Sequence, residues 1–228
     1  GVQGLADVFF MLGLPFESQG AQELNKRIFS QIYYSAMRQS CDLARVLGRH
    51  PSFENSPASS GVLQFDLWKQ RPSADFDWTS LKSDIITYGL RNSLLTTVMP
   101  TASTAQILGN TECIEPINSN VYVRRTLAGE FIVINRFLVS DLQKLGLWNV
   151  DMKQLVVASR GSVQHIPTIP PHIKDLYKTV WEMNGRTLID MAADRGIYID
   201  QSQSLNIHME DVTMGKLYAL HFYTWRKG

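Results

Sequence analysis

The chain has 228 residues, of which 44% are apolar and 19% are charged, and its 22 basic and 21 acidic side chains leave a formal charge of +1. This composition excludes a disordered chain, and the near-neutral charge argues against a nucleic-acid partner. No apolar run approaches the roughly 20 residues that cross a bilayer, so we expect no membrane partner. Two cysteines, Cys41 and Cys113, are too few for a disulfide framework or a zinc site. They predict a reducing, cytoplasmic location and no bound metal.

Both ends of the chain are apolar and patterned. The chain begins with Gly1 rather than Met, and an aromatic-rich run over residues 217–225 comes shortly before its end at Gly228. The ends of ordinary domains tend to be polar and frayed. We therefore expect a piece of a longer chain, forming a single partial domain over residues 1–228.

The first third of the chain is predicted to be helical. Residues 5–12 form a short helix, and Ser18 caps a longer one that ends near Gly48. Asp77 caps a further helix with an apolar face, which Gly89 ends.

The middle of the chain combines strands with a short helix. Residues 94–99 are an uninterrupted apolar and β-branched run, which predicts a buried strand. Pro100 ends it because proline has no N–H to donate to a ladder, and residues 101–108 lead from a loop into a helix. Two further β-branched or aromatic runs, residues 121–126 and 131–135, predict a hairpin.

The last third is again mainly helical. We expect helices over residues 137–145 and 151–159, and then one long helix that ends at Gly196. An extended stretch around residues 205–207 precedes a final helix over residues 214–225. Helices thus alternate with single buried strands, which predicts an α/β fold with mainly parallel pairing.

The strongest chemical signal lies where the strand is expected to end and the next helix to begin. In α/β folds ligands lie at the carboxyl ends of strands, and a helix N-terminus offers unpaired N–H groups and a positive dipole end. Thr101, Ala102, Ser103 and Thr104 are small or carry hydroxyls, so a phosphate could approach their backbone. The alternative is that Thr101, Ser103 or Thr104 only caps the helix, which is the commoner arrangement.

Other chemically suggestive residues have simpler explanations. Glu112 and Glu115 could be paired carboxylates on one helical face, but a charge pair at a helix end or a solvated turn is commoner. Arg124 and Arg125 are neighbours in a strand, so only one can face a given site and a surface ion pair is the default. His208 begins a pattern like that of zinc deaminases, without the cysteine pair that completes it. No catalytic residue and no metal ligand is therefore assigned.

Several longer segments resemble one known family. Residues 99–110, with the sequence Met-Pro-Thr-Ala-Ser-Thr-Ala-Gln-Ile-Leu-Gly-Asn, are similar to the loop that holds the substrate diphosphate in the large subunit of class I ribonucleotide reductase. Residues 1–7, 78–92, 200–208 and 221–225 resemble the same family, in the same order and in its eukaryotic-type form. The resemblance covers essentially the entire chain.

The resemblance implies a fold, an activity and partners. The fold would be a ten-stranded α/β barrel, of which this chain is the second half and the N-terminal half is the partner. The activity would be radical-based reduction of ribonucleoside diphosphates to deoxyribonucleoside diphosphates for DNA synthesis, with the diphosphate held by Thr101, Ala102, Ser103 and Thr104. The parent enzyme would take a radical from a small subunit and electrons from a dithiol reductant, and ATP and deoxynucleoside triphosphates would be its effectors.

The family's radical-forming cysteine is not found in this sequence. The finger-loop motif Asn-x-Cys-x-Glu does not occur, and Cys41 and Cys113 match none of the family's catalytic or redox cysteines. Residues 97–100 read Thr-Val-Met-Pro, where many relatives have Ala-Pro-Met-Pro. We therefore expect that the isolated fragment binds no cofactor and has no activity. The alternative is a stand-alone, non-catalytic module that binds nucleotide phosphate or a partner subunit.

Overall fold

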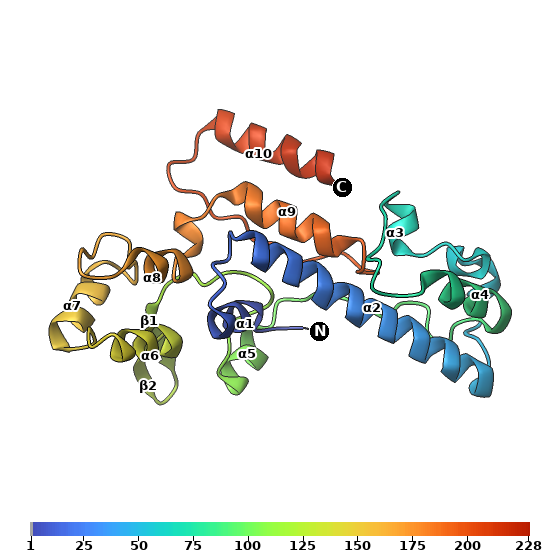
Figure 1. Ribbon diagram of the computed structural model, residues 1–228, viewed down its shortest axis with the longest axis horizontal. Helices are drawn as coiled ribbons and strands as arrows, with labels where there is room; N and C mark the ends of the chain where they lie inside the picture. Colours follow the sequence, from blue (N-terminus) through green and yellow to red (C-terminus); the bar gives the residue numbers. More distant parts are fainter. Residues whose placement is uncertain (1) are drawn as a thin grey trace.

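A long helix runs through the middle of an elongated, mainly helical molecule (Figure 1). The computed structural model describes residues 2–228, so Gly1, the first residue of the N-terminal motif, lies outside the described residues. Helix α1 (Leu5–Leu12) is followed by this long helix, α2 (Gln19–Leu47). Ser18 caps α2 as predicted, because its hydroxyl accepts the N–H of Ala21 at 3.2 Å.

The remaining elements occupy the two ends of the molecule and the surface along α2 (Figure 1). In chain order they are η1 (Phe53–Asn55), η2 (Pro57–Ser60), α3 (Gln64–Leu67), α4 (Trp78–Tyr88), α5 (Ala102–Leu108), β1 (Val121–Thr126), β2 (Gly129–Ile134), α6 (Arg136–Lys144), α7 (Val150–Ala158), α8 (Pro171–Leu176), η3 (Val180–Glu182), α9 (Gly185–Gly196) and α10 (Met214–Lys227).

Two hydrophobic clusters form the core. The larger one packs α1, α2, α4 and α9 together around aromatic side chains that include Tyr33 and Trp78. The smaller one lies among α6, α7 and α8 and includes Leu138 and Tyr177. Phe10 of α1 packs against both clusters and stacks on Tyr177 with ring centroids 5.0 Å apart. The start of the chain therefore joins the two halves of the core.

The run predicted as a buried strand does not form a ladder. Among the described residues, 94–99 make one isolated parallel bridge, between Val98 and Gln203. The regular sheet is the antiparallel hairpin of β1 and β2, which confirms the predicted hairpin. The prediction of mainly parallel pairing is therefore wrong for residues 2–228, although the helices predicted on either side of this run are present.

A carboxylate replaces the expected neighbouring strand. Asp200 Oδ2 accepts the N–H groups of Leu95 at 2.7 Å and Thr96 at 3.1 Å. The Thr96 hydroxyl donates to the carbonyl of Tyr198 at 3.0 Å. Backbone groups that a ladder would satisfy are thus bound by side chains, because buried N–H and C=O groups need a partner of some kind.

The long helix predicted to end at Gly196 is three separate elements, α8, η3 and α9. Thr179 and Glu182 form a capping box, in which Glu182 accepts the Thr179 N–H at 2.7 Å. Asn184 then caps α9 by accepting the N–H of Arg186 at 3.0 Å. These caps start new helices within a stretch whose apolar spacing fits a single helix. Gly196 is the last residue of α9, not the residue beyond it.

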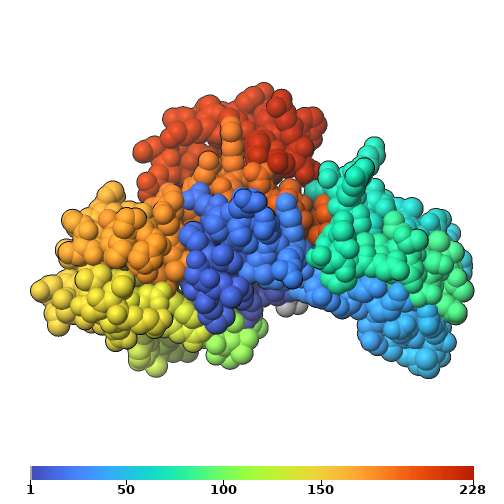
Figure 2. Space-filling view, in the orientation of Figure 1, coloured from blue at the N-terminus to red at the C-terminus, as the bar shows by residue number. Residues whose placement is uncertain are grey.

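Helix α10 confirms the predicted C-terminal helix and lies over α9 as an outer layer of the molecule (Figure 2). The Tyr223 hydroxyl donates to Asp190 Oδ1 of α9 at 2.7 Å. No residue of α10 is buried, however, and Tyr218, Phe222 and Trp225 are 64%, 41% and 75% exposed. This aromatic face of α10 has no covering element among the described residues. Among all the helices of residues 2–228, none is long and apolar enough to cross a membrane.

We predict that the purified 228-residue chain associates and binds a hydrophobic dye, because exposed apolar patches of more than a few hundred Å² are unusual in soluble monomers. Replacing Phe222 and Trp225 together by Gln should reduce both effects, measured by dye fluorescence and analytical ultracentrifugation. Val150→Gln is the matched control, since Val150 is 70% exposed and lies on α7 away from α10. A compact wild-type monomer with one cooperative melt and no dye binding would contradict the prediction.

Candidate functional site

The predicted phosphate-binding residues lie at the start of α5. Thr101 is the N-cap residue, and Ala102, Ser103 and Thr104 are the first three helical residues. The first N–H groups of a helix have no partner within it. In the structure of residues 2–228, these three N–H groups donate no hydrogen bond, and the three side chains are exposed. The predicted arrangement of free amides at a helix start is therefore present.

The hydroxyls of this segment have different partners. Thr101 is 6% exposed and makes no side-chain cap on α5, because its Oγ1 accepts the N–H of Cys113 at 2.8 Å. The Thr104 hydroxyl donates toward Gln3 Oε1 at 3.0 Å. The Ser103 hydroxyl has no partner among the described residues. Thr101 therefore anchors the loop, and Ser103 carries the hydroxyl that is available to a ligand.

The N-terminal residues hold the segment that follows α5. The Gly4 N–H donates to the carbonyl of Cys113 at 2.9 Å. Asp7, which is 8% exposed, accepts the N–H of Thr111 at 2.6 Å and its hydroxyl at 2.5 Å through Oδ2. Gln3 Nε2 also donates to Asn110 Oδ1 at 3.1 Å, so two segments that carried the family resemblance, 107 positions apart in the chain, are in direct contact.

A third segment, residues 200–208, is fixed by charged side chains. Glu115 accepts the backbone N–H of Asn206 at 2.8 Å. Arg195 is 2% exposed and donates to the Gln203 side chain at 2.8 Å. Burial lowers the pKa of Arg195 to about 10, against the opposing effect of the Glu115 charge, so the guanidinium stays positive at neutral pH. Glu115 therefore positions a backbone segment.

The two glutamates considered as an acid/base pair do not share a helix. Glu112 is exposed and Glu115 half-buried, and both lie in the turns and bends beyond α5. The predicted helical face is therefore wrong, and the alternative of a turn is confirmed for Glu112. Arg125 pairs with Glu130 across the hairpin at 2.7 Å, with both side chains mostly exposed, so a surface ion pair is confirmed there.

The cysteines and His208 have packing roles. Cys41 is fully buried in α2, and burial raises the pKa of its thiol. Cys113 is also buried, and its thiol donates to the carbonyl of Met99 at 3.4 Å. His208 lies edge-on to Trp181, with ring centroids 4.8 Å apart. Among residues 2–228 no group of three or more His, Cys, Asp or Glu side chains is placed to hold a metal ion.

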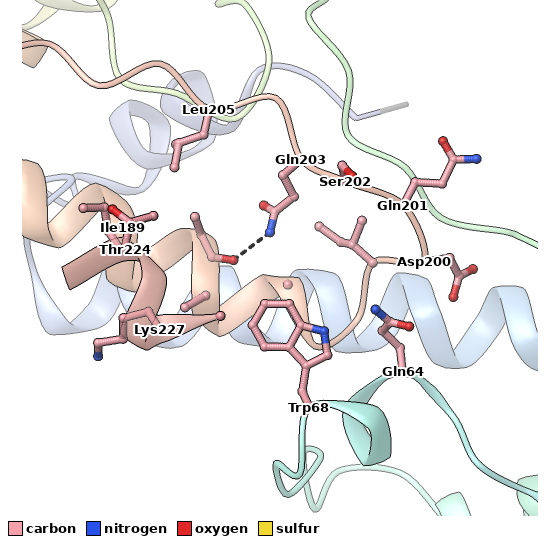
Figure 3. Close-up of a pocket in the computed structure, with 15 residues that line it drawn as sticks. Gln64, Trp68, Ile189, Asp200, Gln201, Ser202, Gln203, Leu205, Thr224 and Lys227 are labelled. Atoms are coloured by element: carbon pink, nitrogen blue, oxygen red, sulfur yellow. Dashed lines mark hydrogen bonds between the residues drawn. The ribbon is translucent and has the colours of Figure 1, made fainter. Parts of the chain in front are cut away.

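A cavity of about 420 Å³ lies elsewhere, between α3, α9, α10 and residues 199–205 (Figure 3). Trp68 and Gln64 line one side and Lys227 another. The Gln203 side chain also lines it, but its Nε2 donates to the carbonyl of Ala192 at 2.8 Å and is therefore used within the fold. None of residues 101–104 reaches this cavity, so it is separate from the start of α5.

The comparison with known families accounts for the whole chain. Residues 1–228 match the family model described as "Ribonucleotide reductase, barrel domain". The chain belongs to this family. The resemblance seen in the sequence segments is thereby confirmed.

Individual relatives of this chain, called the barrel chain below, are reductase large chains and support the same family. It is 54% identical over 228 residues to ribonucleoside-diphosphate reductase large chain 2 of Saccharomyces cerevisiae, covering 100% of this chain and 26% of that protein. It is 57% identical to the ribonucleoside-diphosphate reductase large chain of Schizosaccharomyces pombe, covering 100% of this chain and 28% of that protein. The barrel chain thus spans about a quarter of the length of these relatives.

The barrel chain also resembles a solved structure. The class Id ribonucleotide reductase alpha subunit of Actinobacillus ureae matches it with a TM-score of 0.76 and 26% sequence identity. The match covers 100% of this chain and 36% of that one. The arrangement of its elements is therefore a portion of a reductase alpha-subunit fold.

We predict that Thr101→Val lowers the free energy of unfolding by about 1–3 kcal/mol, because it leaves the Cys113 N–H without an acceptor in a buried position. Thr104→Val is the matched control, and its effect should be below about 0.5 kcal/mol because that side chain is exposed. Urea unfolding, measured in the α10 double-Gln variant to limit association, checks both values. Equal effects of the two variants would contradict the anchoring role of Thr101.

Proposed function

We propose that this chain is the C-terminal half of the catalytic barrel in the large subunit of a ribonucleoside-diphosphate reductase. The parent enzyme reduces ribonucleoside diphosphates to deoxyribonucleoside diphosphates by radical chemistry, in the cytoplasm, for DNA synthesis. The proposal is supported by relatives that are large chains of ribonucleoside-diphosphate reductases, at 54–57% identity over the whole of this chain. A parent chain about four times longer leaves room for the N-terminal half of the barrel and for binding of ATP and deoxynucleoside triphosphate effectors.

Within that enzyme, Thr101, Ala102, Ser103 and Thr104 hold the substrate diphosphate. The observation that carries this assignment is the set of three unpaired N–H groups at the exposed start of α5, beside the free hydroxyl of Ser103. A diphosphate offers only acceptor oxygens and negative charge, and both are favoured at a helix N-terminus. Thr101 contributes by holding the backbone, because its own hydroxyl faces Cys113.

The chemistry at the ribose requires groups from outside this chain. A cysteine that forms a radical must be accessible to substrate, whereas Cys41 and Cys113 are both buried. The radical comes from a small subunit and the electrons from a dithiol reductant, so this chain binds and orients the substrate and supplies no cofactor of its own. The N-terminal half of the barrel is its partner along residues 94–99, where the structure has a single bridge in place of a ladder.

We predict that Ser103→Pro in the full-length large subunit raises the KM for nucleoside diphosphate about tenfold or more. The change removes one N–H and one hydroxyl, and hydrogen bonds to charged groups contribute about 1.5–3 kcal/mol each. Proline is tolerated in the first turn of a helix, so α5 should still form. Steady-state assays with the small subunit measure the effect, and Ser103→Ala should give a smaller one. Unchanged KM and kcat in Ser103→Pro would exclude a diphosphate site here.

We also predict that the isolated 228-residue chain has no reductase activity. The assay contains the small subunit, a dithiol reductant and a nucleoside diphosphate, and the deoxy product is measured. The control is the same chain with Cys41→Ser and Cys113→Ser. Turnover above this control would show that one of the two thiols takes part. Tight phosphate binding without turnover by a compact monomer would favour the stand-alone binding module instead.

A further inference from the structure

One side chain from the N-terminal segment connects the two ends of α5. Gln3 Oε1 lies 3.0 Å from the hydroxyl of Thr104, the third residue of the helix. Gln3 Nε2 donates at 3.1 Å to the side-chain oxygen of Asn110, just beyond the residue that ends the helix. Both ends of the Gln3 amide are therefore in use, and each holds a different end of the seven-residue helix.

The backbone that carries Gln3 is itself fixed. The next residue, Gly4, donates its N–H to the carbonyl of Cys113 at 2.9 Å. Three positions further on, Asp7 binds Thr111 twice from a nearly buried position. The backbone of Gln3 is thus held in place by its neighbours, so the hydrogen bonds of its side chain can hold α5 in a fixed position.

The contact determines what the Thr104 hydroxyl can do. Its neighbours are Gln3 Oε1 at 3.0 Å and the carbonyl oxygen of Thr101 at 3.2 Å. Both are acceptors, and a hydroxyl has one proton to donate. Phosphate oxygens are also acceptors, so a diphosphate would have to compete for a proton already in use. Thr104 therefore offers a ligand its backbone N–H, in an orientation set by its side chain.

The geometry points to Gln3 as a positioning residue for substrate binding, which acts on the diphosphate through Thr104 and does not touch it. This inference rests on the proposed diphosphate site. Gln3 holds the first turn of α5 so that its N–H groups face the ligand, and it keeps the Thr104 hydroxyl turned toward protein acceptors. Loss of Gln3 should weaken diphosphate binding without altering the reaction that follows it.

The test is a double-mutant cycle in the full-length large subunit assayed with its small subunit. Gln3→Met keeps the length of the side chain and removes both hydrogen bonds, and Thr104→Val keeps the shape and removes the hydroxyl. Each change should raise the KM for nucleoside diphosphate about two- to tenfold with kcat unchanged, as expected for the loss of one hydrogen bond that supports binding. The double variant should be no worse than the more affected single variant, because both changes break the same contact.

Two results would overturn the role of Gln3. If the two effects multiply, the Thr104 hydroxyl contacts substrate independently of Gln3. If only the melting temperature moves and the KM does not, the contact is structural. The control pair is Gln31→Met with Ser35→Ala, which removes a similar amide–hydroxyl contact of 2.9 Å on the exposed face of α2 and should leave the KM unchanged.

Ser103→Pro separates this inference from the proposed site. A raised KM in Ser103→Pro with a normal KM in Gln3→Met would overturn the role of Gln3 alone. A normal KM in Ser103→Pro would overturn the diphosphate site, and the role of Gln3 with it.

Discussion

Carboxylate side chains hold the extended segments of this chain together in places where a closed sheet would use a ladder. Asp200 accepts two successive N–H groups, those of Leu95 and Thr96, and so joins the segment before α5 to the one after α9. On the other side of α5, Asp7 accepts the N–H and the hydroxyl of Thr111 and so joins α1 to the segment after α5. A carboxylate has about four lone-pair sites, so one side chain can satisfy neighbouring donors that would otherwise be buried without partners. These two carboxylates fix the segments on either side of α5.

This bracing explains how the start of α5 can carry free donors. Helices in a packed core usually have their first N–H groups capped by a side chain. Here Thr101 occupies the capping position, but its hydroxyl accepts the Cys113 N–H and does not cap the helix. The first turn is instead held by Gln3, whose Oε1 accepts the hydroxyl of Thr104. Because the loop is fixed by contacts that do not involve the N–H groups of residues 102–104, those groups remain available. A rigid backbone with unpaired donors is what binding of a diphosphate requires, since little ordering is then needed on binding.

The same structure has surfaces that its own residues do not cover. The aromatic face of α10 is exposed, and within the described part of the chain residues 94–99 have one bridge to residue 203 and no ladder. Within a longer reductase subunit, such surfaces are where further segments of the barrel would pack. Most of the helices nevertheless contribute buried side chains to the two hydrophobic clusters, which are joined at Phe10. The chain therefore forms a substantial core of its own.

The sequence by itself determined much of this picture. Local signals placed the starts of two helices correctly: Ser18 and Asp77 each cap a helix by accepting an N–H three residues on. The family followed from long contiguous strings, and these included residues 101–104. Each of these features depends on residues close together in the chain, whose types and order are directly visible in the sequence.

The tertiary structure decided the rest. The apolar spacing before Gly196 fits one helix, but the caps made by Thr179, Glu182 and Asn184 divide it into separate elements. The apolar run of residues 94–99 predicts a strand in a sheet, but the Asp200 side chain binds its backbone where a neighbouring strand was expected. The sequence also could not show that, of three candidate hydroxyls, only that of Ser103 has no partner within residues 2–228. Hydrogen-bond partners in these cases lie up to about 100 positions away, as with Gln3 and Thr104. A donor's availability depends on which distant acceptor folding brings to it, and that is a property of the assembled structure.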